Sequence, residues 1–489
     1  NKNGGFKTTD IPNTELYEDG AALIFDADGN GFLDIYITSG GTERYAGHQA
    51  YQDRIYYNFN GNLQEGELPE MLTSTSAISG GDFDNDGDTD LFVGGRIVPG
   101  KYPIAPRSYI LENKNGKFVD VTDSVCPFLN KAGMVTAAIW TDFNNDYKLD
   151  LIVVGEFMPI TFLQGNGSEL KNITAESGLD NNSGLWNSII SGDFDNDGDI
   201  DFVAGNLGLN SHLQVGDGKP VRLDYADFDD NGSVDPIVSK FEQGKYYPIN
   251  SLDQLEKQLP SIKKKYRYYS TFANSSTDDI IELFGSKIYN TLEANEFRTS
   301  YIENLGNNTF KLSALPIDTQ LAPINGILAE DINYDNYLDL IMVGNNYAAE
   351  VGMGRYDASI GHVLLNNGDG SFKSVSHEKS GFSVIGDSKS IVKIDADNKP
   401  LFVIARNDDT LKVFSLNKPI QKFLEPKPNE VFLIINHEDG SKRKIELTLG
   451  GGYLSQTSNK IEITSFVKSV VFYDSFGNIT RSLNFDLNQ

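Results

Sequence analysis

The sequence predicts an all-β protein built from a repeated unit of four strands. An acidic loop of nine residues recurs along the chain, and each copy lies between two short apolar segments. The loop that begins at Asp26, for example, is preceded by GAALIF and leads into LDIYITSGG. Between the copies, NG, GN and DG dipeptides favour further tight hairpins, as in YILENKNGKFVDVT. Two hairpins per repeat give four strands, which is the size of one blade of a β-propeller.

The acidic loop has six well-formed copies, and the clearest lies in GDFDNDGDTDLFVGG at 81–95. In this copy Asp82, Asp84, Asp86 and Asp90 stand at positions 1, 3, 5 and 9, and Gly87 stands at position 6. Recurrence with an insertion between copies indicates a repeat protein. The copies begin at Asp26, Asp82, Asp142, Asp193, Asp227 and Asp331.

A seventh copy, at Asp395, has lost the pattern, because Lys399 takes position 5 and Val403 takes position 9. We expect the Lys399 ammonium to stand where an ion would be. The segments SIVKID, LFVIAR and LKVFSL indicate three strands there, and the N-terminal NKNGGFKTTDI resembles the last hairpin of a repeat. We therefore expect the N-terminus to supply the missing strand and close a seven-bladed ring. If an upstream blade is missing instead, the ring has eight blades.

The loops predict bound Ca²⁺, because a hard cation that takes six to eight oxygens suits oxygen ligands at alternating positions. They are not EF-hands, which need an acidic residue at position 12, where the second loop has Val93. The ligands must instead close with Asp at position 9. Position 6 requires a positive φ, which glycine and Asn336 tolerate and which Tyr147 adopts at a cost. The Asp142 loop is therefore the weakest candidate site of the six.

We predict up to six structural Ca²⁺ ions, since no acid, base or nucleophile pattern accompanies the loops. The predicted ligands at positions 1, 3, 5, 7 and 9, with position 7 contributing its carbonyl, are Asp26, Asp28, Asn30, Phe32 and Asp34; Asp82, Asp84, Asp86, Asp88 and Asp90; Asp142, Asn144, Asp146, Lys148 and Asp150; Asp193, Asp195, Asp197, Asp199 and Asp201; Asp227, Asp229, Asn231, Ser233 and Asp235; and Asp331, Asn333, Asp335, Tyr337 and Asp339.

Composition narrows the class of protein. The chain has 489 residues, 39% apolar residues, 47 glycines and a formal net charge of −28, which describes a folded acidic protein. The acidic balance argues against non-specific binding to nucleic acid. No apolar run is long enough for a transmembrane helix. The single Cys126 excludes a disulfide framework and is expected to be a buried thiol.

The chain divides into a predicted propeller at 1–418 and a second β module at 419–489. Within the fifth repeat, about 249–298, helical spacing marks an insertion. The insertion is either a flap packed on the propeller or a partner-binding element, and its run of Lys263, Lys264, Lys265 and Arg267 is more often a solvated face. Alternating apolar residues after Phe423 suggest a small antiparallel sandwich, and the short linker LEPKPNE suggests that it is docked or semi-rigid.

The acidic loops resemble the FG-GAP/VCBS repeats of integrin-like β-propellers, whose blades carry DxDxDGxxD loops. The strings DRIYYN, GGRIVPGKYP, VVGEFMPITF, WNSIISGDFDNDGDIDFVAGNLGLN and GRYDASIGHVLL look more specifically like bacterial proteins related to the cartilage acidic protein family. GGGYLSQTSNKIEI and VVFYDSFG are similar to the ASPIC/UnbV domain that accompanies such propellers, although Tyr473, Asp474, Ser475, Phe476 and Gly477 replace its usual Trp-Pro-Asp-Gly.

The resemblance implies an exported, calcium-stabilised protein at the bacterial outer-membrane surface, often a lipoprotein whose anchor lies upstream, in a complex for glycan or nutrient uptake or for adhesion. It implies no enzymatic activity. The abundance of Asp clusters also favours a calcium-rich, extracellular setting.

The expected function is binding of a protein partner or a glycan on the face opposite the calcium loops. Loops between the first and second strands of a blade lie on one face, and those between the second and third lie on the other. The second set carries Arg and Tyr residues, which are favoured interface anchors. The candidate partner face comprises Arg44, Tyr45, Arg96, Tyr102, Arg107, Asn206, Asn210, Arg355, Tyr356 and Asp357.

The alternative is a carbohydrate-active enzyme, a lyase or hydrolase, or a lectin on the same scaffold. The same loops contain Glu156, Asp357, His48, His212 and His362, but no spacing in the sequence pairs an acid with a base.

Overall fold

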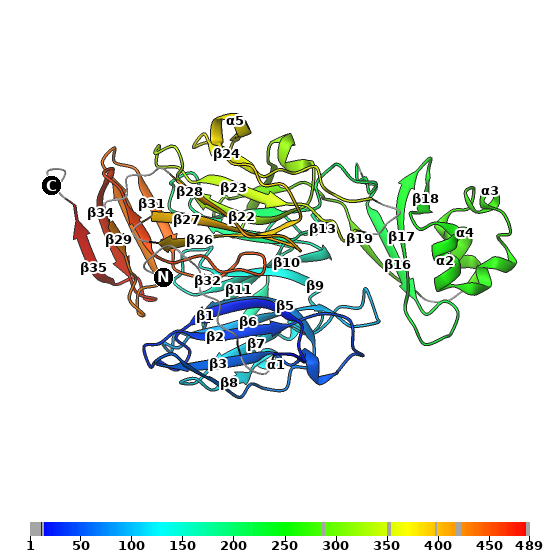
Figure 1. The fold of residues 1–489 in the computed structure, drawn as a ribbon, viewed down its shortest axis with the longest axis horizontal. Helices are drawn as coiled ribbons and strands as arrows, with labels where there is room; N and C mark the ends of the chain where they lie inside the picture. The colour runs from blue at the N-terminus through cyan, green and yellow to red at the C-terminus, as the bar shows by residue number, and fades with distance from the viewer. Residues whose placement is uncertain are drawn as a thin grey trace.

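The chain is an all-β protein whose sheets are arranged as blades of a propeller (Figure 1). The computed structural model describes residues 11, 14–216, 218–285, 289–349, 354–396, 399–416 and 422–485. Residues 1–10, 12 and 13 lie outside this set, so the expected N-terminal closing strand stays a prediction.

Six antiparallel sheets form the blades of the described chain. Their first strands contact one another in the series β1, β5, β9, β14, β22 and β26, so these strands line the inside of the ring. The strands are β1 (Asp19–Phe25), β2 (Asp34–Ser39), β3 (Arg54–Phe59) and β4 (Asn62–Glu65) in blade 1; β5 (Ser74–Gly81), β6 (Asp90–Ile97), β7 (Tyr109–Asn113) and β8 (Phe118–Asp120) in blade 2; β9 (Met134–Thr141), β10 (Asp150–Met158), β11 (Thr161–Gly165), β12 (Leu170–Asn172) and the short β13 (Gly184–Leu185) in blade 3; β14 (Ser188–Gly192), β15 (Asp201–Gly205), β20 (Ser300–Asn304) and β21 (Phe310–Ala314) in blade 4; β22 (Ile324–Glu330), β23 (Asp339–Gly344), β24 (His362–Asn366) and β25 (Phe372–Val375) in blade 5; and β26 (Ser388–Ala396), β27 (Lys399–Arg406) and β28 (Lys412–Ser415) in blade 6.

The blades pack through buried apolar side chains on both faces of each sheet. Trp140 and Trp186 are fully buried, Trp140 in the core between blades 2 and 3 and Trp186 in the core between blades 3 and 4. Short helices occupy loops between strands: η1 (Gln49–Tyr51), α1 (Thr122–Val125), η2 (Pro127–Lys131), η5 (Ile317–Gln320) and α5 (His377–Ser380).

The structure corrects the predicted number of blades from seven to six within the described residues. The prediction counted the Asp227 loop as a blade of the ring. That loop instead belongs to an insertion between β15 and β20 of blade 4, and β14 contacts β22 directly, which leaves no place for another blade there.

The insertion, residues 206–299, forms a separate lobe at the right of Figure 1. Its helices pack on their own sheet around buried Leu255, Ile262, Tyr266 and Ile280, so the lobe has its own core. The elements are β16 (Val221–Ala226), β17 (Asp235–Glu242), β18 (Lys245–Pro248), α2 (Leu252–Gln258), η3 (Pro260–Lys264), α3 (Tyr269–Phe272), α4 (Thr277–Ile281), η4 (Glu282–Phe284) and β19 (Asn290–Ala294). Helices α2, α3 and α4 lie within the segment 249–298 where helical spacing was expected, and this segment is the second half of a larger lobe.

The C-terminal module is a small antiparallel β unit with its own core around Leu433, Ile435, Val470 and Phe472. It lies at the end of the molecule opposite the insertion (Figure 1). The expectation that it is docked on the propeller is confirmed by the contacts described below. Its strands are β29 (Lys422–Leu424), β30 (Phe432–His437), β31 (Lys442–Glu446), β32 (Leu449–Gly450), β33 (Ile461–Ile463), β34 (Val467–Tyr473) and β35 (Ile479–Asn484).

The segment 449–458 of this module, which we call the bridging segment, connects three blades. Its strand β32 pairs with β5 of blade 2. The Gln456 side chain accepts from the Ile24 amide at 2.7 Å and donates to the Ile24 carbonyl at 3.0 Å in blade 1. The Ser458 amide donates to the Lys393 carbonyl at 3.0 Å in blade 6. The first and sixth blades are therefore joined through the C-terminal module.

Candidate metal centres and the opposite face

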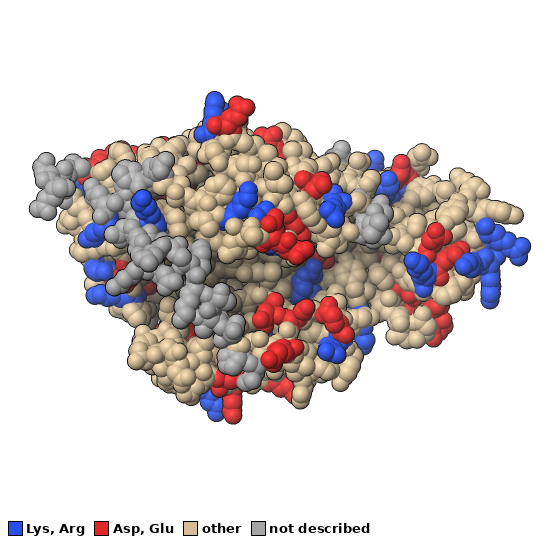
Figure 2. Space-filling model, in the orientation of Figure 1, with Lys and Arg blue, Asp and Glu red and all other residues tan. Residues whose placement is uncertain are grey.

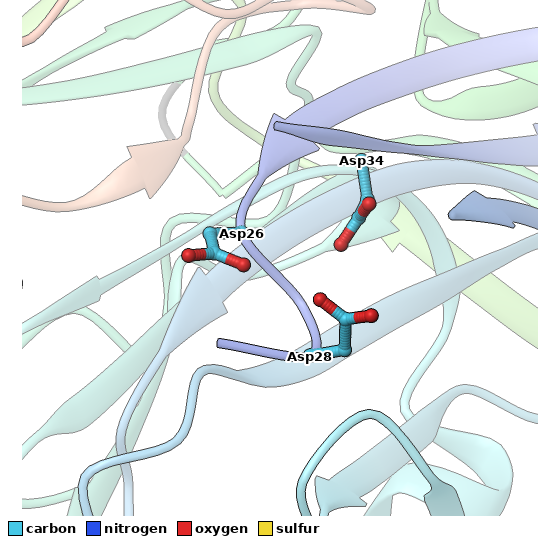
Figure 3. Close-up of side chains that lie close together, drawn as sticks. All are labelled: Asp26, Asp28 and Asp34. Carbon is cyan, nitrogen blue, oxygen red and sulfur yellow. The ribbon is translucent and has the colours of Figure 1, made fainter. Parts of the chain in front are cut away.

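Each acidic loop connects the first two strands of its sheet, as predicted. In blade 1, Phe25 ends β1 and pairs with Asp34 at the start of β2, so position 9 returns beside position 1. Figure 3 shows the carboxylates of Asp26, Asp28 and Asp34 turned toward a common point. Four loops bring three carboxylate oxygens within 4.8 Å of one another: those of Asp26, Asp28 and Asp34; Asp82, Asp84 and Asp86; Asp193, Asp195 and Asp197; and Asp227, Asp229 and Asp235.

The loops at Asp142 and Asp331 carry asparagine at position 3, and among the described residues they do not bring three carboxylate oxygens this close together. The Asp142 loop is nevertheless folded like the Asp82 loop. In each loop, the amide at position 5 donates to the side chains at positions 1 and 3. The Asp146 amide donates to Asp142 and Asn144, both at 2.9 Å. The Asp86 amide donates to Asp82 at 3.1 Å and to Asp84 at 3.2 Å. Metal binding by these two loops stays a prediction.

Two loop positions adopt a positive φ. At position 6 the φ values run from 65° at Tyr147 to 99° at Gly87, and Asn336 has 71°, so the expected left-handed conformation is confirmed. Position 4 also has a positive φ in every loop, a requirement that the sequence interpretation missed. The signal was present, because position 4 holds Gly, Asn or Asp in five loops, and these residues tolerate that conformation. The position 4 residues are Gly29, Asn85, Asn145, Asn196, Asp230 and Tyr334.

The aspartate at position 9 is almost fully buried in all six loops. In blade 2, Asp90 accepts from the Phe83 amide at 3.0 Å and from the Asn113 amide at 2.8 Å, so it ties the loop to the third strand. Burial raises the pKa of Asp90 to about 8 and that of Asp150 to about 9. The hydrogen bonds from backbone amides lower both pKa values, but less than burial raises them. A bound cation would favour the charged form of these carboxylates.

The residues of these loops fit a hard divalent cation. Carboxylate oxygens converge, and buried oxygens of Asp193 and Asp229 have no hydrogen-bond partner, which a metal would supply. When bound, Ca²⁺ would neutralise the clustered negative charge. Asp26, Asp82, Asp193 and Asp227 with their loop partners are the residues that would hold it.

A set of asparagines connects the loops of neighbouring blades, and sequence reasoning missed this role. The Asn113 side chain donates to the Ala27 carbonyl at 2.9 Å, Asn304 to Phe143 at 2.8 Å, and Asn366 to Phe194 at 2.7 Å. In each case the acceptor is position 2 of the preceding blade's loop. The recurrence of Asn in the last hairpins, ILENKNG, YIENLGN and VLLNNGDG, was visible but was interpreted only as a turn signal.

The C-terminal module covers the loops of blades 3, 4 and 5, which the sequence did not predict. The Lys444 amide donates to Asp193 at 2.8 Å, and its ammonium donates to Asn145 at 2.6 Å. Glu446 accepts from the Asp142 amide at 3.0 Å. The acidic loops therefore form the docking surface for β31.

In the degenerate loop copy of blade 6, which begins at Asp395, the polar contact differs from the expected one with Lys399. Lys399 is exposed at the start of β27, whereas Asp395 accepts from the Ser458 hydroxyl at 2.9 Å. The bridging segment, rather than Lys399, provides the polar partner of this aspartate in the described structure.

The opposite face separates the candidate partner residues into two groups. Arg96 is paired with Glu156 at 2.5 Å, and Arg107 is paired with Asp120 at 2.9 Å, so both guanidinium groups have internal roles. Asn206 is fully buried and caps loops through Leu185 and Glu296, so it is unavailable to a partner, which corrects that expectation.

The remaining candidates are accessible to a partner. Tyr45 is 74% exposed, and Arg44, Asn210, Arg355 and Asp357 are also exposed. Tyr356 is half-buried and shares a hydrogen bond of 3.1 Å with the Ser211 hydroxyl, and Tyr102 is half-buried, with burial raising its pKa.

The histidines considered for catalysis have structural partners. His48 accepts from the Ala50 amide at 3.0 Å and caps η1. His362 lies 3.1 Å from the Ser359 hydroxyl, and burial lowers its pKa to about 4, so it is neutral. His212 is exposed. Neither His48 nor His362 forms a hydrogen bond or ion pair with Glu156 or Asp357, so the described residues give no acid–base pair from this set.

Residues 82–153 and 142–204 match the model of the FG-GAP-like repeat. No curated protein matches the chain. Among solved structures, the chain is similar to the exotype rhamnogalacturonan lyase YesX, with 13% identity, 90% of this chain and 73% of that chain covered, and a TM-score of 0.31. It is also similar to fructofuranosidase from Schwanniomyces occidentalis complexed with fructose, with 9% identity, 96% of this chain and 89% of that chain covered, and a TM-score of 0.27. For the V. cholerae biofilm matrix protein Bap1 the identity is 11%, the coverage is 98% of this chain and 75% of that chain, and the TM-score is 0.21. At these TM-scores the likenesses carry no argument about function.

Proposed function

We propose that this chain is a non-enzymatic binding or scaffold protein, stabilised by up to six Ca²⁺ ions, that holds a protein or glycan partner on the face opposite its calcium loops. The observation that carries the proposal is the division of the two faces. The calcium face is occupied by the C-terminal module, through Lys444 and Glu446, whereas the opposite face presents exposed Arg44, Tyr45 and Arg355.

Exposed Arg and Tyr side chains suit a binding role, since these residues supply large contacts and charge-assisted hydrogen bonds. Arg355 lies 5.1 Å from the centre of the Tyr347 ring, and Tyr45 packs edge-on against His48 with ring centres 5.1 Å apart. These contacts orient the side chains without burying them. They support a preformed surface.

The test compares wild type with Arg44→Ser/Arg355→Ser. Arg96 is left intact, because removing it would strand the buried Glu156 carboxylate. Both proteins, loaded with Ca²⁺, are used to capture partners from a bacterial envelope fraction and from a glycan array. The proposal expects a defined partner that the double variant loses while its melting temperature is unchanged. Equal capture by the two proteins would contradict the assignment of this face.

The setting of the protein belongs to the same proposal. We infer an extracellular location at the bacterial outer-membrane surface, with any membrane attachment through an upstream lipid anchor and no nucleic-acid partner. FG-GAP-like repeats, which match 82–204, are typical of extracellular proteins. Within the described residues, no helix has the length and apolar character to cross a bilayer. We also infer that the C-terminal module is of the ASPIC/UnbV type, on the motifs quoted above.

The absence of enzymatic activity is itself part of the proposal. Incubating the purified protein with a panel of acidic and neutral polysaccharides should release neither reducing ends nor unsaturated sugars. Release of either product would favour the lyase or hydrolase alternative, and binding without release would favour a lectin.

A further inference from the structure

The free end of the insertion carries a concentrated basic surface on an otherwise acidic protein. Residues 257–269 hold Lys257, Lys263, Lys264, Lys265 and Arg267, all exposed. Figure 2 shows blue side chains gathered at the far end of this lobe, away from the ring. Because the whole chain has a net charge of −28, a local cluster of this kind needs its own explanation.

Most of these cations form no ion pair with a described carboxylate. Lys263 forms an ion pair with Glu256 at 3.1 Å. Lys257, Lys264, Lys265 and Arg267 form no ion pair with any carboxylate of the described residues. Elsewhere in the protein, exposed cations commonly lie beside carboxylates, as Lys171 does beside Glu176. Residues 257–269 therefore display an excess of positive charge, since this segment holds five cations and no carboxylate of its own.

The basic segment is held in a fixed shape by the core of the lobe. Ile262 is 1% exposed and Tyr266 is 2% exposed, and the Tyr266 ring packs edge-on against Phe272 with centres 5.5 Å apart. These anchors stand on either side of Lys263, Lys264 and Lys265. The cations are thus displayed by a folded platform, and only their own side chains need to be ordered by a ligand.

Two exposed aromatic rings complete the surface. Tyr268 is 72% exposed and Tyr269 is 59% exposed, and the Tyr269 hydroxyl donates to Asp253. In the described residues 251–285, the other large hydrophobic side chain that is exposed is Leu283. The tip therefore lacks the aliphatic anchors that a membrane-inserting segment or a helix-binding groove requires.

We propose that residues 257–269 form a binding surface for an acidic polysaccharide, that is, a chain of sugars bearing carboxylate or sulfate groups. The unpaired cations complement a repeated negative charge, and the tyrosine faces offer stacking surfaces for sugar rings. The lysines act as point charges on long stems, which suits a polymer without a single fixed geometry. This surface lies outside the candidate partner face and does not depend on it.

The experiment titrates the full-length, Ca²⁺-loaded protein with a short oligogalacturonide and, separately, with its methyl ester, which lacks the charge. Wild type should bind the acid form, bind the ester at least about tenfold more weakly, and lose affinity as salt is raised. Lys264→Ser/Lys265→Ser/Arg267→Ser should weaken binding of the acid form about tenfold and flatten the salt dependence. Tyr268→Ala should weaken it about fivefold with the salt dependence retained.

The matched control is Lys131→Ser/Lys373→Ser/Lys379→Ser, which removes three exposed lysines from other parts of the surface. It changes the net charge by the same amount and should bind the oligogalacturonide within about twofold of wild type. Equal loss in the control and the tip variant, or equal binding of acid and ester, would overturn the proposal. Stronger binding of the tip to duplex DNA or to phosphatidylglycerol vesicles than to the oligogalacturonide would also overturn it. Arg44→Ser/Arg355→Ser should bind the oligogalacturonide like wild type, which separates this surface from the candidate partner face.

Discussion

The two faces of the propeller use charged residues in opposite ways. On the calcium face, carboxylates such as Asp90 and Asp201 are buried, hydrogen-bonded to backbone amides and covered in part by a second module. On the opposite face and at the tip of the insertion, Arg44, Arg355 and Lys264 are exposed and unpaired with described carboxylates. We expect the first face to determine stability and the second to contribute little to it.

Removal of calcium should have the largest effect. An ion that binds only the folded state stabilises it by about 2.7 kcal/mol per site at a hundredfold excess over Kd, and the described loops offer several sites. We expect EGTA to lower the melting temperature by more than about 10 °C, measured by calorimetry. Magnesium at the same concentration is the control and should restore less stability. A melt that EGTA leaves unchanged would contradict the metal assignment.

Replacing a position 9 aspartate should have the next largest effect. Asp201→Ala removes a metal ligand and leaves the amides of Phe194 and Asn304 and the Tyr301 hydroxyl without their acceptor. We expect a loss of about 3 to 5 kcal/mol in the free energy of unfolding, measured with denaturant. Asp357→Ala, on the opposite face, is the matched control. Similar losses of unfolding free energy in the two variants would contradict the inference that the face with the acidic loops contributes more to stability than the opposite face.

The pH dependence should change sign with calcium. Burial raises the pKa of Asp90 and Asp201 to about 8 and of Asp150 to about 9 in the folded state, from the usual 3.8 of an aspartate. Without metal, the folded state keeps protons that the unfolded state has released, so stability is lost progressively as pH rises toward 8 to 9. We expect EGTA-treated protein to lose about 1 to 3 kcal/mol between pH 6 and 8.

With saturating calcium the trend should reverse, because protons compete with the ion for the same carboxylates. Melting temperatures at both pH values, with EGTA or with Ca²⁺, test this. Parallel trends under the two conditions would show that these aspartates do not bind the ion.

The asparagine links between blades should have an intermediate effect. Asn304→Ala removes donors to Phe143 and Ile200, at 2.8 and 3.2 Å, in a buried setting. We expect a loss of about 1 to 3 kcal/mol in the free energy of unfolding. Asn210→Ala, at an exposed position, should cost less than about 0.5 kcal/mol. An equal loss of unfolding free energy in the Asn210 and Asn304 variants would mean that the asparagine links contribute no more to stability than an exposed asparagine does.

The smallest effect is expected on the opposite face. Arg44→Ser/Arg355→Ser should change the free energy of unfolding by less than about 0.5 kcal/mol, because both side chains are exposed. Denaturant unfolding of the same preparation used for partner capture measures this. A large destabilisation would mean that these arginines support the fold, and loss of partner capture could no longer be assigned to the surface.

The repeated parts of the fold were predictable because their signals are local. An Asp at every second position, a residue that tolerates positive φ at position 6 and an apolar strand on each side specify a hairpin from fewer than twenty residues. The same reasoning could not place the Asp227 hairpin outside the ring, because its local sequence matches the others. Only the contact between β14 and β22 shows that it does not form a blade.

The covering of the calcium face was beyond the reach of sequence reasoning for a similar reason. Lys444 and Asp193 are separated by 251 positions, and neither residue carries a mark of its partner. The burial of Asn206 and the pairing of Arg96 with Glu156 likewise depend on how loops from different elements meet. Residue type favoured the opposite-face candidates, but tertiary contacts decide which of them remain available.

The bridging segment sets the order in which this protein can fold. Gln456 binds Ile24 across 432 positions of sequence, so the contact that joins the first blade to the last has one of the longest separations in the chain. During synthesis the blades can form one by one, but this contact must wait until the C-terminal module has left the ribosome. Until then the nascent protein exposes the edge of β5 and the backbone groups of Ile24 and Lys393 that the bridging segment covers in the finished molecule.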